Sequence, residues 1–316
     1  MHLNNQGAMA TASTHINNSR VWLVTGCSSG LGLALIQEVL ASGERVVATL
    51  RKPADIASLA DKYPSTQLLV EQLDVTDAAR TKAVFEATRA HFGRLDVVVN
   101  NAGYGMQGEF ETFPEEAAKA MMDVLFWGPA RICREAIRFM REVNPPGQGG
   151  RILNITSMGG FVGFPTGSFY HAGKFALEGT TESFAKELLP EWNIKATLIE
   201  PGGFRTRFIE AAFVRTPVAP VYNKPHAPGV FMRKITEDPS IFVGDVAKAA
   251  KAMVRIAGLE DPPIRIQLGT DSLMAVKVKA ESTIRDIERW EEISHSTNLD
   301  GVVKEKIMEN FGVATK

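Results

Sequence analysis

Short apolar runs recur along the chain and are separated by longer segments with mixed polar and apolar positions. Each run is rich in Val, Ile and Leu, as expected for strands buried on both faces of a parallel sheet. Seven segments fit this description: residues 21–25, 45–50, 67–77, 95–103, 151–156, 195–200 and 264–269. The pattern therefore predicts about seven strands.

The segments between these runs have the apolar spacing of helices. Helices are expected after the first strand up to Gly43, from Asp77 to about His91, from Pro114 to Val143, from Ser168 to about Leu189, and from Asp245 to about Ala257. Such alternation predicts an α/β fold: a Rossmann-like, doubly wound parallel sheet with helices on both faces, in a single domain.

Composition narrows the class of protein. The chain has 316 residues, a formal net charge of -1 and 45% hydrophobic residues, which disfavours nucleic acid or an anionic membrane surface as a partner. Two cysteines, Cys27 and Cys133, are too few for a disulfide framework and are expected to be packing residues. Without a long apolar run or a secretory signal, residues 1–19 are interpreted as a disordered tail, and a cytoplasmic location is expected.

A glycine-rich turn follows the first strand and precedes the first helix. It reads Thr25-Gly-Cys-Ser-Ser-Gly-Leu-Gly32. Glycines let a pyrophosphate approach the backbone, and the helix N-terminus offers free N–H groups, so this turn predicts a dinucleotide site. The second strand ends in Leu50, Arg51 and Lys52, where an NAD site would need an acid. Because a guanidinium matches a 2′-phosphate, Arg51 favours NADP(H), although both cations could simply lie on a solvated turn.

A second candidate site is Ser157, Tyr170 and Lys174. Ser157 follows the strand 151–156, and Tyr170 and Lys174 lie one turn apart if the segment from Ser168 is helical. An ammonium beside a phenol lowers the phenol pKa, so Lys174 is expected to bring the pKa of Tyr170 towards neutrality. The three groups suit proton transfer to a carbonyl or alcohol oxygen. His171 is interpreted as a solvent or substrate-rim residue.

These motifs together resemble the short-chain dehydrogenases/reductases over residues 20–270. The further matches are Asp74-Val75, Asn100-Asn101-Ala102-Gly103, and Pro201-Gly202 with Thr206. The resemblance implies catalysis by Ser157, Tyr170 and Lys174, no metal, and NADP(H) bound by Gly26, Ser28, Ser29, Gly30, Leu31, Gly32, Arg51, Asp74, Val75, Asn101, Ala102, Gly103, Tyr170, Lys174, Pro201, Gly202 and Thr206.

The sequence departs from the family at one catalytic position. The family usually has an Asn three residues before Gly128, where it kinks the helix and frees a carbonyl for a water linked to the Lys. Here the residue is Leu125. The departure puts the proton relay in doubt more than the redox step.

An apolar, proline-interrupted stretch from Arg207 to Phe242 predicts a substrate lid, within about residues 203–242. Residues 271–316 are expected to form a helical extension of the same domain, with apolar positions from Leu273 to Trp290 at helical spacing. This helix could cover the substrate cleft or a subunit surface.

Together these features predict an NADP(H)-dependent oxidoreductase that interconverts a carbonyl and an alcohol, on a hydrophobic or cyclic small-molecule substrate. The alternatives are a non-redox isomerase, dehydratase or cyclase on the same fold, or a cofactor-sensing regulatory protein. The resemblance also implies a homodimer or homotetramer, with the long helices around Leu125 and Tyr170 as candidate interfaces.

Overall fold

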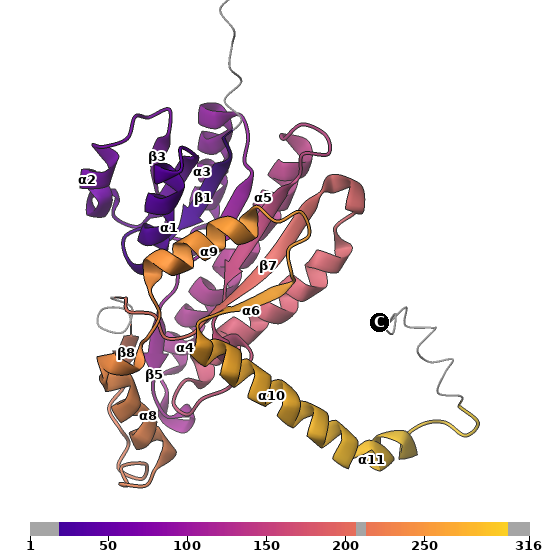
Figure 1. Cartoon of the computed structure of the whole chain (residues 1–316). Coiled ribbons are helices and arrows are strands. Elements are labelled where there is room, and N and C mark those ends of the chain that lie inside the picture. Colours follow the sequence, from indigo (N-terminus) through magenta and orange to yellow (C-terminus); the bar gives the residue numbers. More distant parts are fainter. Residues whose placement is uncertain (1–18, 207–212, 303–316) are drawn as a thin grey trace, which may run out of the picture.

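A parallel seven-stranded sheet forms the centre of the molecule. The computed structural model describes residues 19–206 and 213–302 (Figure 1). The strand order is β3-β2-β1-β4-β6-β7-β9. The strands are β1 Val21–Thr25, β2 Arg45–Leu50, β3 Leu68–Gln72, β4 Val97–Asn100, β6 Gly150–Ile155, β7 Ile194–Pro201 and β9 Arg265–Leu268. The doubly wound fold predicted from the apolar runs is confirmed, although β3 and β4 are shorter than their runs.

Helices cover both faces of the sheet. Helices α1 Gly30–Ala41 and α9 Val246–Ala257 pack on one face around Trp22, and α3 Ala78–Phe92, α5 Gly128–Glu142 and α6 Ser168–Glu187 cover the other face. A short helix, α2 Ala57–Ala60, follows β2. Asp77 and Asp245 accept backbone N–H bonds at the first turns of α3 and α9, which confirms both expected helix starts.

The predicted helix from Pro114 to Val143 is interrupted. It consists of α4 Glu115–Met122, a π-helical turn Asp123–Trp127, and α5. The wider turn inserts one residue into the helical repeat and changes which side chains face the interior. Leu125, at its centre, is fully buried. Hydrophobic spacing alone does not reveal such an insertion.

A small region lies beyond the carboxyl ends of the strands. Strands β5 Gly105–Gln107 and β8 Phe213–Arg215 form a two-stranded parallel sheet, and helix α8 Pro228–Glu237 lies beside them (Figure 1). The region contains most of the expected lid; residues 207–212 of that prediction lie outside the described residues.

The C-terminal helices extend away from the body. Helix α10 Thr270–Arg289 begins next to β9, and α11 Glu291–Ser296 continues it outward (Figure 1). Residues 1–18 of the expected N-terminal tail, which the sequence predicts over 1–19, and residues 303–316 lie outside the described residues. Within the described ranges, the helices lack the length and apolar character needed to cross a bilayer.

Candidate active site

One large cavity of about 1020 Å³ lies where the parallel strands end. It opens at the point where the strand order reverses, between β1 and β4, the usual position of a ligand site in such sheets. All predicted site residues except Gly32 line it: Gly26, Ser28, Ser29, Gly30, Leu31, Arg51, Asp74, Val75, Asn101, Ala102, Gly103, Ser157, Tyr170, Lys174, Pro201, Gly202 and Thr206. Motifs spread over 180 residues of sequence thus surround one space.

The glycine-rich turn forms a backbone cradle at one end of the cavity. Gly26 and Gly30 have φ values of +71° and +59°, which a residue with a Cβ rarely adopts. Ser29 precedes α1, so the first N–H groups of that helix face the cavity end. Gly32 lies behind the cradle, where a Cβ would clash with the Asn101 amide and come within 2.5 Å of the Gly26 oxygen. The close backbone and the helix N-terminus fit a bound pyrophosphate.

The turns after β1 and β4 are joined by hydrogen bonds. The Thr25 hydroxyl accepts from the backbone N–H groups of Asn101 and Ala102, each at 3.0 Å. The Asn101 side chain donates to the Thr25 carbonyl at 2.8 Å. These bonds hold the two turns that face the cavity in a fixed relation.

Arg51 lies on the cavity wall directly after β2. Its carbonyl accepts from the Gln72 side chain at 3.0 Å, and its guanidinium is close enough to act on Asp74. The pKa of Asp74 lies below its ordinary value, mainly because its carboxylate accepts hydrogen bonds from Thr76, with Arg51 a smaller cause. The Asp74 carboxylate is therefore ionised, and Arg51 lies on a part of the cavity wall that also includes Asp74 and Asp55.

Ser157, Tyr170 and Lys174 come together at the other end. Ser157 starts a short 3-10 turn after β6 and accepts from the Gly159 N–H at 3.0 Å. A hydrogen bond joins the hydroxyls of Ser157 and Tyr170. The Lys174 ammonium donates to the Ile155 carbonyl at 2.8 Å and lies 5.9 Å from the Tyr170 ring centroid.

The pKa of Tyr170 differs in direction from the sequence-based expectation. Burial raises it above its ordinary value, and the hydrogen bond with Ser157 only partly offsets this effect. Burial also lowers the pKa of Lys174 to about 8, against the opposing influence of Glu178. The expected lowering of the tyrosine pKa by Lys174 is therefore wrong in this environment. With its pKa raised, the Tyr170 phenol keeps its proton at neutral pH.

Leu125 lies beneath these residues. A Cβ at Gly103 would come 3.2 Å from its side chain, and one at Gly173 would come 2.9 Å from it. The π-helical turn supplies the local irregularity that the family resemblance assigned to an Asn, although Leu125 has no amide. The helix is therefore irregular at Leu125, as the resemblance implies for this position, but the side chain there is apolar rather than an amide.

Two polar or charged residues near Lys174 have contacts that the sequence did not indicate. His171 lines the cavity, in agreement with the substrate-rim alternative, and its ring is also bonded to the protein: its Nδ1 lies 2.8 Å from the Gly159 carbonyl, and its Nε2 accepts from the Phe164 N–H at 3.1 Å. Glu178, one turn after Lys174, is buried, and burial raises its pKa to about 7. Its i,i+4 spacing from Lys174 was the signal available in the sequence.

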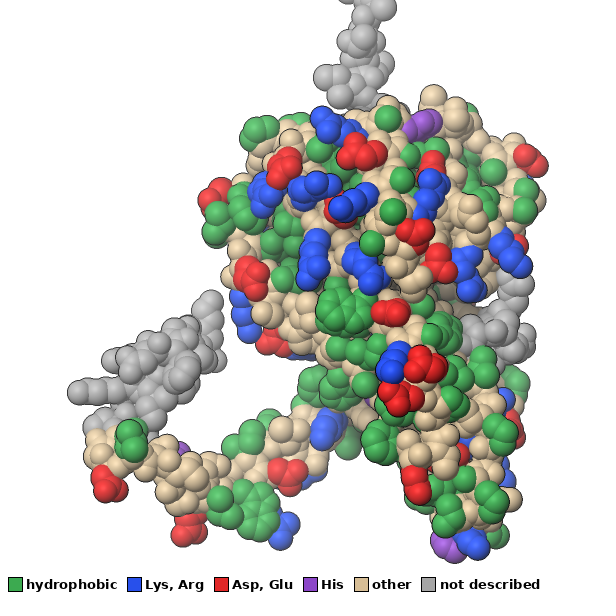
Figure 2. Space-filling model, turned by 180° about the vertical axis from the view of Figure 1, so that it is seen from behind, with side chains coloured by type: hydrophobic (Ala, Val, Ile, Leu, Met, Phe, Trp, Pro, Cys, Tyr) green, Lys and Arg blue, Asp and Glu red, His purple; other side chains and the backbone are tan. Residues whose placement is uncertain are grey.

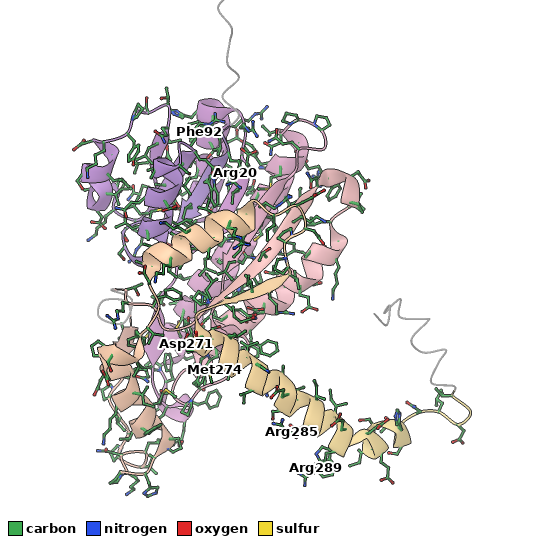
Figure 3. The ribbon with its side chains drawn as sticks, viewed as in Figure 1. Arg20, Phe92, Asp271, Met274, Arg285 and Arg289 are labelled. Carbon is green, nitrogen blue, oxygen red and sulfur yellow. The ribbon has the colours of Figure 1, made fainter. Side chains whose placement is uncertain are left out.

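Asp271 anchors the turn after β7. Its carboxylate accepts from the Gly203 N–H at 2.6 Å, and the adjacent Ser272 hydroxyl donates to the Glu200 carbonyl at 2.7 Å. Figure 3 shows Asp271 at the base of α10, against the body. Thr206, at the end of this turn, lies close to Gly30, where a Cβ would be 3.3 Å from the threonine side chain. No local pattern in the sequence indicates the Asp271 contact.

Comparisons with known proteins agree with this geometry. Residues 20–215 match the family model described as short chain dehydrogenase. The chain is 36% identical over 282 residues to an uncharacterized oxidoreductase of Schizosaccharomyces pombe, covering 88% of this chain and 91% of the relative. It is 38% identical over 198 residues to human 17-beta-hydroxysteroid dehydrogenase type 1, covering 60% and 58%.

A solved structure extends the similarity to nearly the whole fold. A short-chain dehydrogenase from Streptomyces avermitilis superposes with a TM-score of 0.81 at 35% identity, over 89% of this chain and 99% of that one. With the family model over residues 20–215, the resemblance inferred from the sequence motifs is confirmed. The chain therefore belongs to the short-chain dehydrogenase family of nicotinamide-dependent oxidoreductases.

Proposed function

We propose that this protein interconverts a ketone or aldehyde and an alcohol with NADP(H), on a hydrophobic or cyclic substrate. The observation that carries the proposal is the hydrogen-bonded pair Ser157 and Tyr170, next to Lys174, in the cavity whose other end is the glycine cradle and Arg51. Proton-transfer groups and a dinucleotide cradle thus share one space.

In the reductive direction, Tyr170 donates its proton to the carbonyl oxygen while that oxygen is held by the Ser157 hydroxyl. The glycine cradle would hold the cofactor, whose nicotinamide would supply the hydride for the carbonyl carbon. The raised pKa keeps Tyr170 protonated before the reaction and favours this direction near neutral pH. The Lys174 ammonium, fixed by the Ile155 carbonyl, stabilises the tyrosinate that remains.

The preference for NADP(H) rests on Arg51. An Arg–phosphate contact is a charge-assisted interaction worth about 1.5–3 kcal/mol. Arg51→Ala should therefore raise the KM for NADPH by roughly tenfold or more and leave that for NADH almost unchanged. Lys52→Ala is the matched control, since Lys52 is exposed and outside the cavity lining. An undiminished NADPH preference in Arg51→Ala would remove the assignment.

The substrate class is inferred from the lid end of the cavity. Apolar side chains line that end: Val214, Met232, Ile235, Ile241 and Phe242. NADPH absorbance followed with a panel of cyclic ketones, aliphatic ketones and charged oxo acids tests the proposal. A preference for small charged oxo acids would contradict the substrate class.

Tyr170→Phe separates the proposed reaction from its alternatives. We expect loss of turnover with cofactor binding retained, because the variant lacks only the transferable proton. Substrate conversion without a stoichiometric absorbance change would instead indicate a non-redox enzyme. Cofactor binding with no turnover of any panel member would indicate a regulatory protein.

We also propose a homodimer or homotetramer and a cytoplasmic location. The exposure of Trp127 and Phe175 on the helices around Leu125 and Tyr170, 43% each, supports an interface there. Both cysteines are free and buried, which is compatible with a reducing compartment.

A further inference from the structure

We propose that His171 is a positioning residue that holds the Ser157 turn in its reactive place. The inference rests on the proposed function and extends it to a cavity-lining residue that acts through Ser157. His171 lies in the first turn of α6, whereas the segment it holds, residues 157–167, links β6 to α6.

The imidazole bridges two points of this segment. Its Nδ1 lies 2.8 Å from the Gly159 carbonyl, and its Nε2 accepts from the Phe164 N–H at 3.1 Å. Because Phe164 donates to Nε2, the ring proton is on Nδ1 and is donated to Gly159, so a single neutral tautomer satisfies both bonds. Burial lowers the pKa of His171, which maintains the neutral form.

Gly159 connects the imidazole to the reactive hydroxyl through its two backbone groups. Its N–H donates to the Ser157 Oγ at 3.0 Å, and its carbonyl, on the other side of the Cα, faces His171. Movement of this residue would therefore displace the hydroxyl that hydrogen-bonds Tyr170. The path from His171 to Ser157 is one residue long.

Two glycines make room for the ring. A Cβ at Gly159 would come 2.6 Å from Nδ1, and a Cβ at Gly167 would come 2.5 Å from Nε2. On its remaining sides the ring lies 5.7 Å from the Phe164 ring and 5.6 Å from the Tyr170 ring, centroid to centroid. The space left by these two glycines matches the size of an imidazole, and both ring nitrogens are hydrogen-bonded. These two observations argue against an incidental contact.

A double-mutant cycle with Ser157 tests the proposal. His171→Leu should lower kcat roughly 10- to 100-fold, as displacement of a catalytic group by about 1 Å does, without changing the Kd for NADPH. Ser157→Ala and the Ser157→Ala/His171→Leu double variant should then have equal kcat, because His171 acts through Ser157. Additive losses would overturn the proposal.

Further variants distinguish failure of the positioning role from failure of the proposed oxidoreductase function. His171→Gln can retain part of the bridge and should recover part of the activity, and His91→Leu, at an exposed histidine, is the matched control. If the wild type itself shows no turnover, the proposed function fails, and amide exchange of residues 157–167 decides the inference. Exchange unchanged in His171→Leu would exclude the positioning role.

A second inference concerns α10 and stands independently. We propose that α10 pairs with α10 of a second copy of this chain, antiparallel, about a two-fold axis at Ala280. Large apolar side chains are exposed along the helix; Leu273, Ile284 and Ile287 share the face of Ala280, whereas Val278 lies on the opposite face. Figures 2 and 3 show the arm standing clear of the body, with Met274 near its base and Arg285 and Arg289 farther out.

The spacing on one face of α10 is symmetric about Ala280. Leu273 and Ile287 are each seven residues from it, and Val276 and Ile284 are each four residues from it, within one narrow stripe. An antiparallel copy therefore places Leu273 against Ile287 and Val276 against Ile284. The small alanine at the centre allows the two backbones to approach closely.

The charges favour the same orientation. Lys277 and Lys279 lie before Ala280, whereas acidic residues outnumber basic ones between residues 281 and 292. Antiparallel pairing brings the basic half of one helix beside the acidic half of the other, and parallel pairing would bring like halves together. A second copy of α10 therefore fits the charges of this helix better than an anionic lipid surface, which the acidic outer half would repel.

Sedimentation and cross-linking test the pairing. Ile284→Glu should reduce the oligomer size, while Val278→Glu, on the opposite face, should leave it unchanged. Ala280→Cys should form a disulfide with its own copy upon oxidation. Leu273→Cys should not, because antiparallel pairing separates the two copies of residue 273 by about 21 Å. Cross-linking of both cysteine variants would indicate parallel pairing and would overturn the proposal, as would cross-linking of neither. Binding of the protein to anionic vesicles that is lost in Ile284→Glu would also overturn it, because the apolar face would then bind lipid.

Discussion

Arg233→Met tests whether a buried ion pair holds α8 in place beside the cavity. Arg233, on α8, donates to both carboxylate oxygens of Glu109 at 3.1 and 3.0 Å, and to the Thr216 carbonyl at 2.8 Å. The two side chains are only 9% and 5% exposed. Removing the guanidinium leaves the Glu109 charge buried and unpaired, which costs about 3–5 kcal/mol.

The cost should appear as local opening rather than global unfolding. The pair joins α8 to the segment after β5, outside the two hydrophobic cores of the sheet. Because about 1.4 kcal/mol corresponds to a tenfold change in an equilibrium constant, the fraction of molecules in which α8 is detached should rise by about a hundredfold or more. Amide exchange in residues 228–237 measures this opening, and urea denaturation measures the smaller global effect.

Two controls sharpen the test. Glu109→Met combined with Arg233→Met replaces the ion pair by apolar groups and should restore most of the protection, since no unpaired charge remains. Tyr222→Phe removes an exposed hydrogen bond of the same region to Glu111 and should have little effect. Equal exchange in the wild type and Arg233→Met, or no recovery in the double variant, would refute the reasoning.

Three further outcomes are expected. Gly32→Ala should weaken NADPH binding by tenfold or more, measured by titration, because its Cβ overlaps the Asn101 amide and overpacking costs about 1–3 kcal/mol. Leu125→Ala should cost about 2–5 kcal/mol in urea denaturation, because a fully buried leucine leaves a cavity. Glu178, with a folded pKa raised to about 7, binds more protons when folded than unfolded between pH 4.5 and 7, so its ionisation lowers stability as pH rises. Glu178→Gln should therefore gain stability relative to the wild type between pH 5 and 8, and a constant difference across that range would contradict the sign.

Most of the fold and the positions around the cavity could be predicted from local sequence. The Val- and Leu-rich runs of β1 and β2 have the observed bounds because parallel strands buried on both faces carry no competing polar pattern. The glycine-rich turn and the Tyr170–Lys174 spacing are local features too, so their neighbours in the sequence identify them.

The remainder depends on contacts between distant segments. The sequence placed His171 at the solvent or at the substrate rim but did not indicate its hydrogen bonds, because its partners, Gly159 and Phe164, reach it only when the preceding turn folds back. Asp271 meets Gly203 across 68 residues. The direction of the Tyr170 pKa shift follows from burial, which sequence spacing does not measure. The sequence therefore predicted which residues line the site better than it predicted their burial and their hydrogen-bond partners.

The attachment of α10 divides that helix into two parts with different structural roles. Its first turn supplies Asp271 and Ser272, which fix the backbone beside the cavity, so substitution there is coupled to the active site. Beyond that turn the helix extends away from the body (Figure 1). The outer arm can therefore be shortened or replaced without moving the cavity wall, provided that the first turn is kept.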